Sequence, residues 1–440
     1  MLSGTAAPTI PSDFDRIDFS AGSAVVAAVS GGSDSTALLL ALAKYLKEQA
    51  PACRLVAVTV DHRLRAGSTA EAAQVAEFCA RRGIEHVTRT WNGAKPATGL
   101  AAAAREARYR LLCEAAGEMG ARLILTGHTA DDQAETVAMR RKRGDGRGLA
   151  GMAPATLVGG RYWLMRPLLG ARRGELRDWL EARGIGWIDD PSNENMTSER
   201  VRARAALAEQ GEAARWLAVA AEAAEARTEL GRRAGAIIDS HSSRPAPGLL
   251  RLNREFCAGD RDGAIYALRI LIAVTGGGPH LPEEAAVADL VGAACADTPL
   301  RTNLARTVID MRRDPIWLHR ERRGLPPAKP AADGLVWDGR YRIEAPTAGW
   351  DVSWQAAVAG DAPQGLPAIV WRGAAAAEPR FVASGREADP ANKPVAVPVA
   401  APWAAFLPSF DLQPARSVMR LIGAAMPPDP PESGKTSLDP

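Results

Sequence analysis

Short apolar runs alternate with longer helical patterns along the first part of the chain. The runs are AVVAAVS from residue 24, RLVAVTVDH from residue 54, EHVTRTW from residue 85 and RLILTGH from residue 122, and helical patterns begin between them near Ser35, Ser68 and Ala101. Strands that alternate with helices of this length predict βαβ units and a parallel, doubly wound sheet. The ligands of such a sheet bind at the carboxyl ends of its strands.

The pattern changes past residue 210. Residues 211–240 are alanine-rich and amphipathic, and helical signals continue to about residue 298. Further on, short runs such as RTVIDMR and PIWLHRE are separated by Gly and Pro, which is typical of a β-rich region. The last residues have the composition of disorder. We therefore predict an α/β domain over residues 1–210, a small helical domain over 211–300, a β-rich domain over 301–425 and a disordered tail over 426–440.

The composition is that of an ordinary soluble globular protein. The chain has 440 residues, of which 47% are hydrophobic and 24% charged. No apolar run approaches the roughly 18 to 20 residues that cross a bilayer. The first residues lack a secretory signal, so we expect a cytoplasmic location. The cysteines lie far apart without a C-x-x-C pair, which favours reduced packing thiols over a disulfide framework, a zinc site or an iron–sulfur cluster. They are Cys53, Cys79, Cys113, Cys257 and Cys295.

The stretch SGGSDST, residues 30–36, joins the first predicted strand to the first predicted helix. Gly31 and Gly32 leave the backbone open to close approach. Because Ser35 and Thr36 lie where the helix begins, successive N–H groups and the positive end of the helix dipole point at one place, which suits a phosphate. The Walker lysine is absent, so the loop suits a pyrophosphate without being built to transfer a γ-phosphate. The alternative is an ordinary turn with Ser and Asp caps.

A second polar cluster, LILTGHTADDQAET, contains the fourth predicted strand and the helix after it. Asp131 and Asp132 lie four and three residues before Glu135, so the three carboxylates share one side of a helix. Carboxylates beside a phosphate loop suit Mg²⁺ or a substrate ammonium group. Acids at a helix N-terminus are also favourable by themselves. His128 ends the strand, where it is either a functional group or a packed core histidine.

Basic residues are concentrated after this cluster. The run MRRKRGDGRGLAGM spans residues 139–152, and further arginines follow at positions 161, 166, 172, 173, 177, 200, 202 and 204. Such a grouping suits a phosphate backbone, and it is equally compatible with solvated helix faces. The net charge of +3 is too small to indicate nucleic-acid binding by itself.

Seven motifs occur in an order that resembles a known family. They are SGGSDST, VDHRLR, AAREARYRLL, GHTADDQAET, GLAGM, RPLLGARRGELRDWL and WIDDPSNENMTSERVRAR. Together they look like the tRNA(Ile)-lysidine synthetase family, which belongs to the PP-loop ATP pyrophosphatases. The first motif is shared across that superfamily, and the series GLAGM, RPLL, DDPSN and a following arginine is more specific. The resemblance covers about residues 24–205 and is weak over the C-terminal half.

The resemblance implies a two-step ligase reaction. ATP adenylates carbon 2 of the wobble cytidine of an isoleucine tRNA with anticodon CAU and releases pyrophosphate. The ε-amine of free L-lysine then displaces AMP and gives lysidine. The resemblance also implies Mg²⁺ with the ATP, an ATP-binding catalytic domain followed by a helical domain that contacts tRNA, and no membrane partner. The sequence is compatible with a homodimer as well as with a monomer.

The matching positions carry the family's roles to this chain. The implied catalytic residues are Asp34, Arg105, His128, Asp132 and Glu135, with Arg108 as a second cation for developing phosphate charge. The implied ATP-binding residues are Ser30, Gly31, Gly32, Ser33, Asp34 and Ser35. Asp132 and Glu135 are the candidates for binding lysine or metal. The implied tRNA-binding residues are Arg140, Arg141, Lys142, Arg143, Arg147, Arg166, Arg200, Arg202 and Arg204.

The chain departs from the family pattern at two positions. Thr129 stands where the family usually has a second histidine, and Val201 stands where it often has asparagine. Neither position lies in the phosphate loop.

Other functions compete with this interpretation. A PP-loop tRNA thiolation enzyme would share the adenylation step but usually needs reactive cysteines, often as C-x-x-C. An amidotransferase would need a glutaminase nucleophile, and none is visible. A non-catalytic nucleotide- or RNA-binding module explains the glycines and arginines but leaves the grouped carboxylates unexplained.

Overall fold

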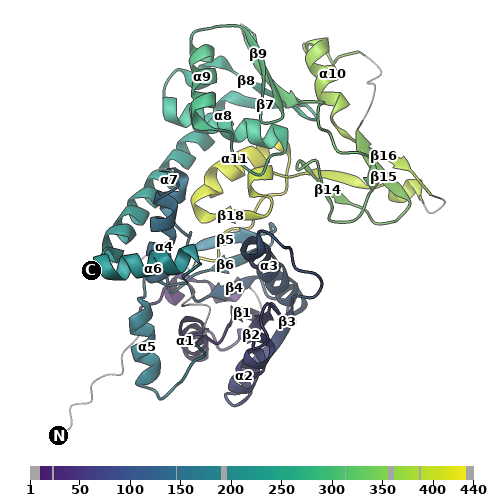
Figure 1. Ribbon diagram of the computed structural model, residues 1–440. Helices are drawn as coiled ribbons and strands as arrows, with labels where there is room; N and C mark the ends of the chain where they lie inside the picture. The colour runs from purple at the N-terminus through teal and green to yellow at the C-terminus, as the bar shows by residue number, and fades with distance from the viewer. Residues whose placement is uncertain are drawn as a thin grey trace. The chain divides into compact units, whose positions relative to one another are not determined.

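The computed structural model describes residues 10–21, 24–144, 146–189, 196–312, 314–354, 361–385 and 388–432. The chain divides into two compact units, residues 1–226 with 428–440 and residues 227–427. Figure 1 follows the chain by colour from the N-terminus to the C-terminus.

A mostly parallel sheet forms the centre of the first unit. The unit's own strands lie in the order β5 (Ala155–Val158), β6 (Tyr162–Met165), β4 (Leu123–Thr126), β1 (Ala24–Ala28), β2 (Arg54–Asp61) and β3 (Glu85–Thr90). All except β5 run parallel to one another, and β5 is antiparallel to β6. β1 and β4 are buried along nearly their whole length, as central strands of parallel sheets are, which explains their continuous apolar runs. The predicted α/β fold class is confirmed.

Helices cover both faces of this sheet. α1 (Ser33–Gln49) and α2 (Ser68–Ala80) lie on one side, and α3 (Leu100–Glu118) lies on the other (Figure 1). Tyr109 and Leu112 of α3 pack against Val26, Val56 and Ile124 of the sheet. α4 (Ala130–Arg141), α5 (Arg173–Glu181) and α6 (Glu199–Gln210) follow in the chain. The first turns of α1 and α4 come directly after β1 and β4, so both start at the carboxyl edge of the sheet.

The second unit combines helices with small antiparallel sheets. α7 (Ala213–His241) leads into it. One sheet has the order β7 (Ser242–Ala246), β8 (Leu249–Leu252), β11 (Ile316–Arg320), β10 (Thr307–Met311) and β9 (Leu300–Leu304), and α8 (Arg261–Gly276) and α9 (Glu284–Cys295) belong to the same part of the unit.

Two three-stranded sheets follow along the chain. Their orders are β12 (Lys329–Pro330), β15 (Trp350–Trp354), β16 (Pro379–Ala383) and β13 (Val336–Trp337), β14 (Tyr341–Glu344), β17 (Val395–Pro398). The remaining elements are α10 (Ala368–Ala376), β18 (Phe406–Pro408) and α11 (Leu412–Ile422). Strands dominate after residue 300, as predicted, although β7 and β8 already occur within the predicted helical part. The predicted boundaries at residues 210, 300 and 425 stay predictions.

A buried carboxylate of the second unit is surrounded by arginines. Asp338 accepts hydrogen bonds from Arg320 Nε at 3.1 Å and from Arg340 Nε at 2.8 Å. Arg306 pairs with the same carboxylate, and Arg340 Nη1 also reaches Glu378 Oε1 at 3.1 Å. The Asp338 side chain is 0% exposed. Because a buried charge is tolerated only when it is paired, this network of arginines maintains the core around Asp338.

Three further expectations from the sequence concern the cysteines, membrane-spanning segments and the C-terminal tail. All five cysteines are free. Over the ranges that the structure describes, every helix is too short or too polar to traverse a lipid bilayer. Residues 426–432 of the predicted disordered tail are described, and the Asp18 N–H donates to the Pro431 carbonyl at 2.9 Å. Residues 433–440 lie outside the described residues.

Candidate functional site

Residues 30–36 form a tight turn after β1 together with the first turn of α1, and we call this segment the cradle. Gly31 has a φ of +88°, a left-handed conformation that glycine adopts readily. A Cβ at Gly31 would lie 2.7 Å from Ile188 Cδ1 and 2.9 Å from Val75 Cγ2. Gly32 is the N-cap of α1 and has no side chain to cap it. The first N–H groups of the helix therefore remain available to an anion.

Two hydroxyl groups hold the cradle in shape. The Ser30 N–H donates to Ser35 Oγ at 3.1 Å, and Ser35 Oγ lies 3.1 Å from the Gly32 carbonyl oxygen. Thr36 Oγ1 donates to the Gly31 carbonyl at 3.2 Å. The serine and threonine of the motif thus bond the loop to itself.

The residue after β4 packs closely against the first turn of α1. Gly127 follows β4, and a Cβ there would lie 2.8 Å from the Asp34 carbonyl oxygen and 3.0 Å from the Ser35 nitrogen. Only glycine lets the end of β4 pack directly on the first turn of α1. The two polar motifs predicted from the sequence are therefore in contact.

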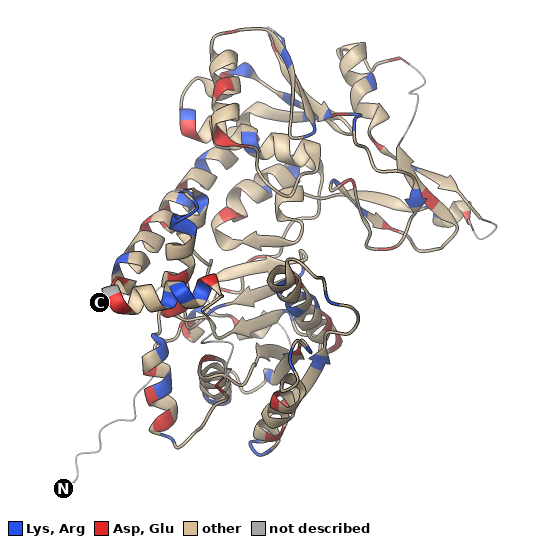
Figure 2. Cartoon of the chain, viewed as in Figure 1, with Lys and Arg blue, Asp and Glu red and all other residues tan. Residues whose placement is uncertain are grey.

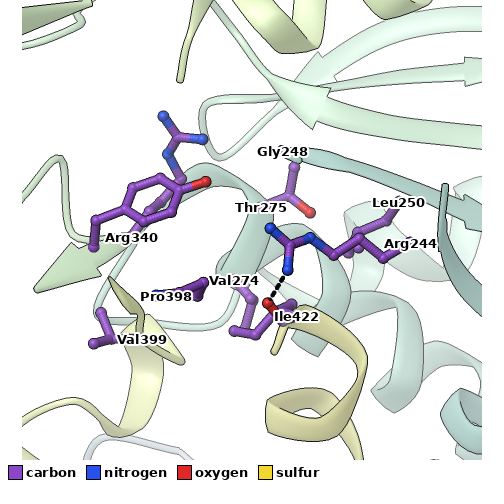
Figure 3. Close-up of a pocket in the computed structure, with 10 residues that line it drawn as sticks. Arg244, Gly248, Leu250, Val274, Thr275, Arg340, Pro398, Val399 and Ile422 are labelled. Atoms are coloured by element: carbon purple, nitrogen blue, oxygen red, sulfur yellow. Dashed lines mark hydrogen bonds between the residues drawn. The ribbon is translucent and has the colours of Figure 1, made fainter. Parts of the chain in front are cut away.

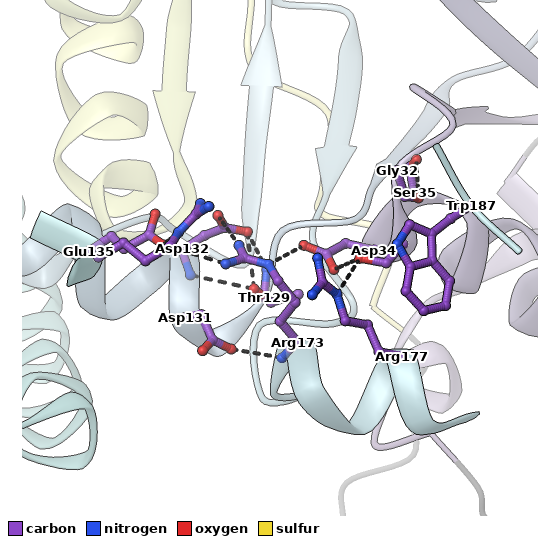
Figure 4. A network of polar contacts seen from close by, with 12 residues as sticks. Gly32, Asp34, Ser35, Thr129, Asp131, Asp132, Glu135, Arg173, Arg177 and Trp187 are labelled. Carbon is purple, nitrogen blue, oxygen red and sulfur yellow. Dashed lines mark hydrogen bonds and ion pairs between the residues drawn. The ribbon is translucent and has the colours of Figure 1, made fainter. Parts of the chain in front are cut away.

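Carboxylates from α1 and α4 converge on Arg173 at the start of α5. Arg173 Nε donates to Asp34 Oδ2 at 3.0 Å, and its Nη2 donates to Asp132 Oδ1 at 2.9 Å (Figure 4). Its Nη1 lies 3.5 Å from Glu135 Oε1. The Arg173 backbone N–H also donates to Asp131 Oδ2 at 2.7 Å. The predicted acids do come together, and they do so around an arginine that the sequence placed in a basic surface.

Two arginines of α6 also face this acidic cluster. Glu135 is buried, and it accepts from Arg200 Nε at 2.8 Å and from Arg204 Nε at 2.6 Å. Arg200 Nη2 lies 3.5 Å from Asp132 Oδ1. Two of the predicted tRNA-binding arginines are therefore engaged with carboxylates in this structure.

Burial and charge shift the two aspartates in opposite directions. Burial raises the pKa of Asp34, and the charge of Arg173 offsets this only in part. Burial would also raise the pKa of Asp132, but the charges of Arg173 and Arg200 outweigh it and lower that pKa. Asp132 is therefore firmly ionised, whereas burial opposes the charge on Asp34.

His128 and Thr129 lie between β4 and α4. His128 Nδ1 is 2.9 Å from Thr126 Oγ1. Burial and the positive charges of Arg166 and Arg108 lower the pKa of His128 to about 3, so its imidazole is neutral near pH 7. Thr129 caps α4, because its Oγ1 accepts from the Asp132 N–H at 3.4 Å and its own N–H donates to Asp132 Oδ2 at 2.9 Å.

The cradle and Asp132 line one cavity of about 650 Å³ at the carboxyl ends of the strands. This is the place predicted for a ligand of a doubly wound sheet. Arg105 and Arg108 of α3 line it, as does His128. One part of its wall is apolar and consists of Ala28, Val29, Val58, Val60 and Leu112. Glu135 instead lines a second cavity of about 320 Å³, and Arg204 lines both.

Two of the predicted tRNA-binding arginines bond the protein's own backbone. Arg140 Nη1 donates to the carbonyls of Gly148 and Gly151 at 2.9 and 2.8 Å, so it fixes the GLAGM turn. Arg166 is 5% exposed and donates to the Ala153 carbonyl at 2.6 Å. Burial lowers the pKa of Arg166 to about 10. Both guanidinium groups are therefore bonded to backbone carbonyls in this structure.

The other predicted tRNA-binding residues are more accessible. Arg141, Lys142, Arg143 and Arg202 are exposed and Arg147 is half-buried. Arg143 pairs with Glu199, and Arg202 donates to two carbonyls just before α6. Figure 2 shows Lys and Arg along α6 and α5. Their binding to RNA stays a prediction.

Besides Arg173, sequence reasoning missed Gln133, which holds the GLAGM turn beside α4. Gln133 Nε2 donates to the Met152 carbonyl at 3.1 Å, and Gln133 Oε1 accepts from the Met152 N–H at 2.7 Å. The residue lies inside the motif ADDQAET, so the signal was its place between the assigned acids. Part of another motif, residues 190–195, lies outside the described residues.

The donor set of Asp34 and Asp132 suits a divalent cation. The guanidinium of Arg173 already stands between the two carboxylates as a positive charge. Within the part of the chain that the structure describes, no group of three or more His, Cys, Asp or Glu side chains could hold a metal by itself. Phosphate oxygens would therefore have to complete the coordination, as they commonly do for Mg²⁺.

A much smaller cavity, of about 40 Å³, lies in the second unit (Figure 3). Arg244 in its wall donates to the carbonyl of Ile422, the last residue of α11. Arginine at a helix C-terminus commonly bonds the last carbonyls, so this contact is structural. None of the predicted site residues lines this cavity.

Comparison with known proteins agrees with the geometry. The model of a PP-loop domain matches residues 10–210. The chain is 47% identical over 456 residues to the tRNA(Ile)-lysidine synthase of Mesorhizobium japonicum, covering 96% of this chain and 97% of that protein. It is 42% identical over 335 residues to the tRNA(Ile)-lysidine synthase of Rhizobium meliloti, covering 73% of each. A solved structure, the U34-tRNA thiolase NcsA from Methanococcus maripaludis with its [4Fe-4S] cluster, matches 46% of this chain and 71% of that chain at 20% identity, with a TM-score of 0.39.

Proposed function

Because this chain belongs to the tRNA(Ile)-lysidine synthase family, we propose that its larger cavity joins lysine to the wobble cytidine of an isoleucine tRNA at the expense of ATP. The protein is an ATP-using ligase of the PP-loop kind. The observation that carries the proposal is that the cradle, Asp132 and several arginines line one cavity. Phosphates, a lysine ammonium and an RNA strand each have a chemical counterpart there.

ATP would lie along the cavity wall with its phosphates on the cradle. The apolar residues Ala28, Val58, Val60 and Leu112 suit the adenine ring, and they line the same cavity as Ser30 and the first turn of α1. The free N–H groups of that turn and its helix dipole favour phosphate oxygens.

The first chemical step would form a bond from the cytosine O2 to the α-phosphorus and release pyrophosphate. Arg105 and Arg108 line the cavity, where they would stabilise the charge on the phosphoryl oxygens. His128 is neutral and has a pKa of about 3, so it suits hydrogen bonding to a substrate better than proton abstraction. In the second step the ε-amine of lysine would attack carbon 2, and AMP would leave.

The acidic cluster would bind the cations. Asp34 and Asp132 would hold Mg²⁺ together with phosphate oxygens, which neutralises the phosphate charge. Asp132 and Glu135 would attract the lysine ammonium. Arg173 and Arg200 now bond these carboxylates, so an incoming cation would compete with their guanidinium groups.

The exposed basic residues after α4 and on α6 would contact the tRNA, whose CAU anticodon must enter the cavity. Arg141, Lys142, Arg143 and Arg202 are the accessible members of this set. A cytoplasmic location and a homodimer stay predictions.

A thiolation function has less support. Such an enzyme usually needs a reactive thiolate, whereas Cys79 is buried in α2 and Cys113 lies in α3. Burial raises the pKa of the Cys113 thiol to about 11, which disfavours the thiolate.

Incubation with ATP, labelled lysine and tRNA carrying a CAU anticodon tests the proposal. Label should enter the tRNA only when ATP is present, and pyrophosphate and AMP should form in equal amounts. Transfer that survives omission of ATP, or no transfer at all, would contradict the proposed function. Transfer of sulfur in place of lysine would support the thiolase instead.

A further inference from the structure

A second arginine of α5 lies beside the cradle, where the Walker lysine is absent. Arg177 is one turn after Arg173, and it lines the larger cavity together with Gly32, Ser33 and Asp34. Its Nε lies 3.5 Å from Ser33 Oγ, at the first residue of α1 (Figure 4). A guanidinium is therefore already placed at the rim of the anion site.

Arg177 is held loosely, in contrast to Arg173. Its Nη2 is 3.5 Å from Asp189 Oδ1, and the side chains of Arg177 and Asp189 are 45% and 75% exposed. The guanidinium carbon lies 5.5 Å from the centre of the Trp187 ring. Exposed ion pairs of this kind contribute little free energy, so a phosphate can replace them. Arg173 is bonded at 2.9 and 3.0 Å to two carboxylates and is not similarly available.

The segment that holds Arg177 is itself attached to the cradle. The Ile188 N–H donates to the Gly31 carbonyl at 2.9 Å, and Trp187 Nε1 donates to Asp189 Oδ1 at 3.1 Å. Asp189 therefore directly follows a residue whose backbone is bonded to the loop, and it gives Arg177 a partner while no phosphate is bound.

We propose that Arg177 binds the pyrophosphate end of ATP and the pyrophosphate product, and that Asp189 is its resting partner. The planar guanidinium suits phosphate oxygens, and it would supply the cation that the loop lacks. This inference rests on the proposed function, because it assigns ATP phosphates to the cradle. Asp189 competes with the phosphates for Arg177, so the two residues should affect binding with opposite signs.

Two substitutions in the full-length protein test this pair. Arg177→Gln should weaken the binding of inorganic pyrophosphate about tenfold, the loss expected from one charge-assisted hydrogen bond, and should raise the KM for ATP by a similar factor while changing kcat less. Asp189→Asn should tighten pyrophosphate binding about two- to threefold, because a neutral amide competes less well for Arg177. Arg177→Lys should restore part of the affinity. Titration calorimetry with pyrophosphate gives the dissociation constants.

Arg183→Gln is the matched control. Arg183 follows α5, and its guanidinium carbon lies 4.0 Å from the centre of the Trp179 ring. Because Arg183 does not line the larger cavity, its substitution should change neither the dissociation constant for pyrophosphate nor the KM for ATP. Unchanged pyrophosphate affinity in a folded Arg177→Gln protein would overturn the proposal. Weaker binding in Asp189→Asn would overturn the resting-partner role. If Arg177→Gln weakens pyrophosphate binding as expected but the wild-type protein transfers no lysine, the proposed function is contradicted and this inference stands.

Discussion

Isosteric substitution of the two aspartates that share Arg173 should separate stability from catalysis. The side chains of Asp34 and Asp132 are 18% and 13% exposed, and they accept from the same guanidinium at 3.0 and 2.9 Å. Burial raises the pKa of Asp34, whereas Arg173 and Arg200 outweigh burial and lower the pKa of Asp132. Asp34→Asn therefore removes a charge that burial disfavours, and Asp132→Asn removes a charge that stabilises the fold.

The expected magnitudes follow from these contacts. Asp132→Asn loses charge-assisted hydrogen bonds, each worth about 1.5–3 kcal/mol, so we expect the free energy of unfolding to fall by about 2 kcal/mol. This corresponds to a fall in melting temperature of about 4–8 °C for a unit of this size. Asp34→Asn loses a comparable bond but also relieves the burial of a charge, so its free energy of unfolding should change by less than about 1 kcal/mol.

The pH dependence of stability tests independently whether the charge of each aspartate stabilises or destabilises the fold. Because the folded-state pKa of Asp132 is lowered, its contribution is present above the unfolded-state pKa and is lost as the pH falls through the folded-state pKa. The deficit of Asp132→Asn should shrink in acid. Because the folded-state pKa of Asp34 is raised, its contribution is present below the unfolded-state pKa and is lost as the pH rises through the folded-state pKa. The relief in Asp34→Asn should therefore appear at neutral pH and vanish in acid.

Scanning calorimetry from neutral to acidic pH and an assay of pyrophosphate release measure both effects. Both variants should release pyrophosphate more slowly by a factor on the order of 10² or more, the usual effect of removing an electrostatic contact to the reacting groups. Equal destabilisation of the two variants at neutral pH would refute the assignment of opposite charge effects. Unchanged pyrophosphate release in Asp34→Asn would remove Asp34 from the mechanism.

Three further variants test other contacts. Gly127→Ala should lower the free energy of unfolding in urea by about 1–3 kcal/mol, because its Cβ would lie 2.8 Å from the Asp34 carbonyl oxygen. Asp338→Asn should lower the free energy of unfolding, measured in the same way, by about 3–5 kcal/mol, because it removes the buried charge that Arg320 and Arg340 face. Replacing residues 141–143 by Gln should reduce the slope of log tRNA affinity against log salt concentration by as much as about 2–3, at roughly 0.7–0.9 per phosphate contact. An unaltered slope supports solvated helix faces.

Local patterns were sufficient to predict the strands and the cradle. The strands β1 and β4 follow from their apolar runs, and the turn after β1 follows from its glycines. Each of these features depends on only a few neighbouring residues, so the sequence alone indicates it. The convergence on Arg173 could not be predicted in the same way. Arg173 is 139 residues from Asp34 in the chain, and the contact forms only because α5 packs against α1.

The basic run after α4 shows a second limit of sequence patterns. Arg140 and Arg141 are adjacent, yet Arg140 turns back to bond the carbonyls of Gly148 and Gly151, while Arg141 is exposed. Successive residues of a helix point about 100° apart, so a run of like charges at a helix end is divided between structure and surface. Its composition alone does not say which member has which role.

The departure from the family pattern at residue 129 has a local physical explanation. Thr129 is fully buried and begins α4, where threonine is a good N-cap. Its hydroxyl and its N–H both bond Asp132, whose carboxylate Arg173 and Arg200 keep ionised. An imidazole at this position would lack the hydroxyl that accepts the Asp132 N–H. The substitution therefore gives the position another task, because Thr129 orients an acidic group of the site through one turn of helix instead of adding a second imidazole to it.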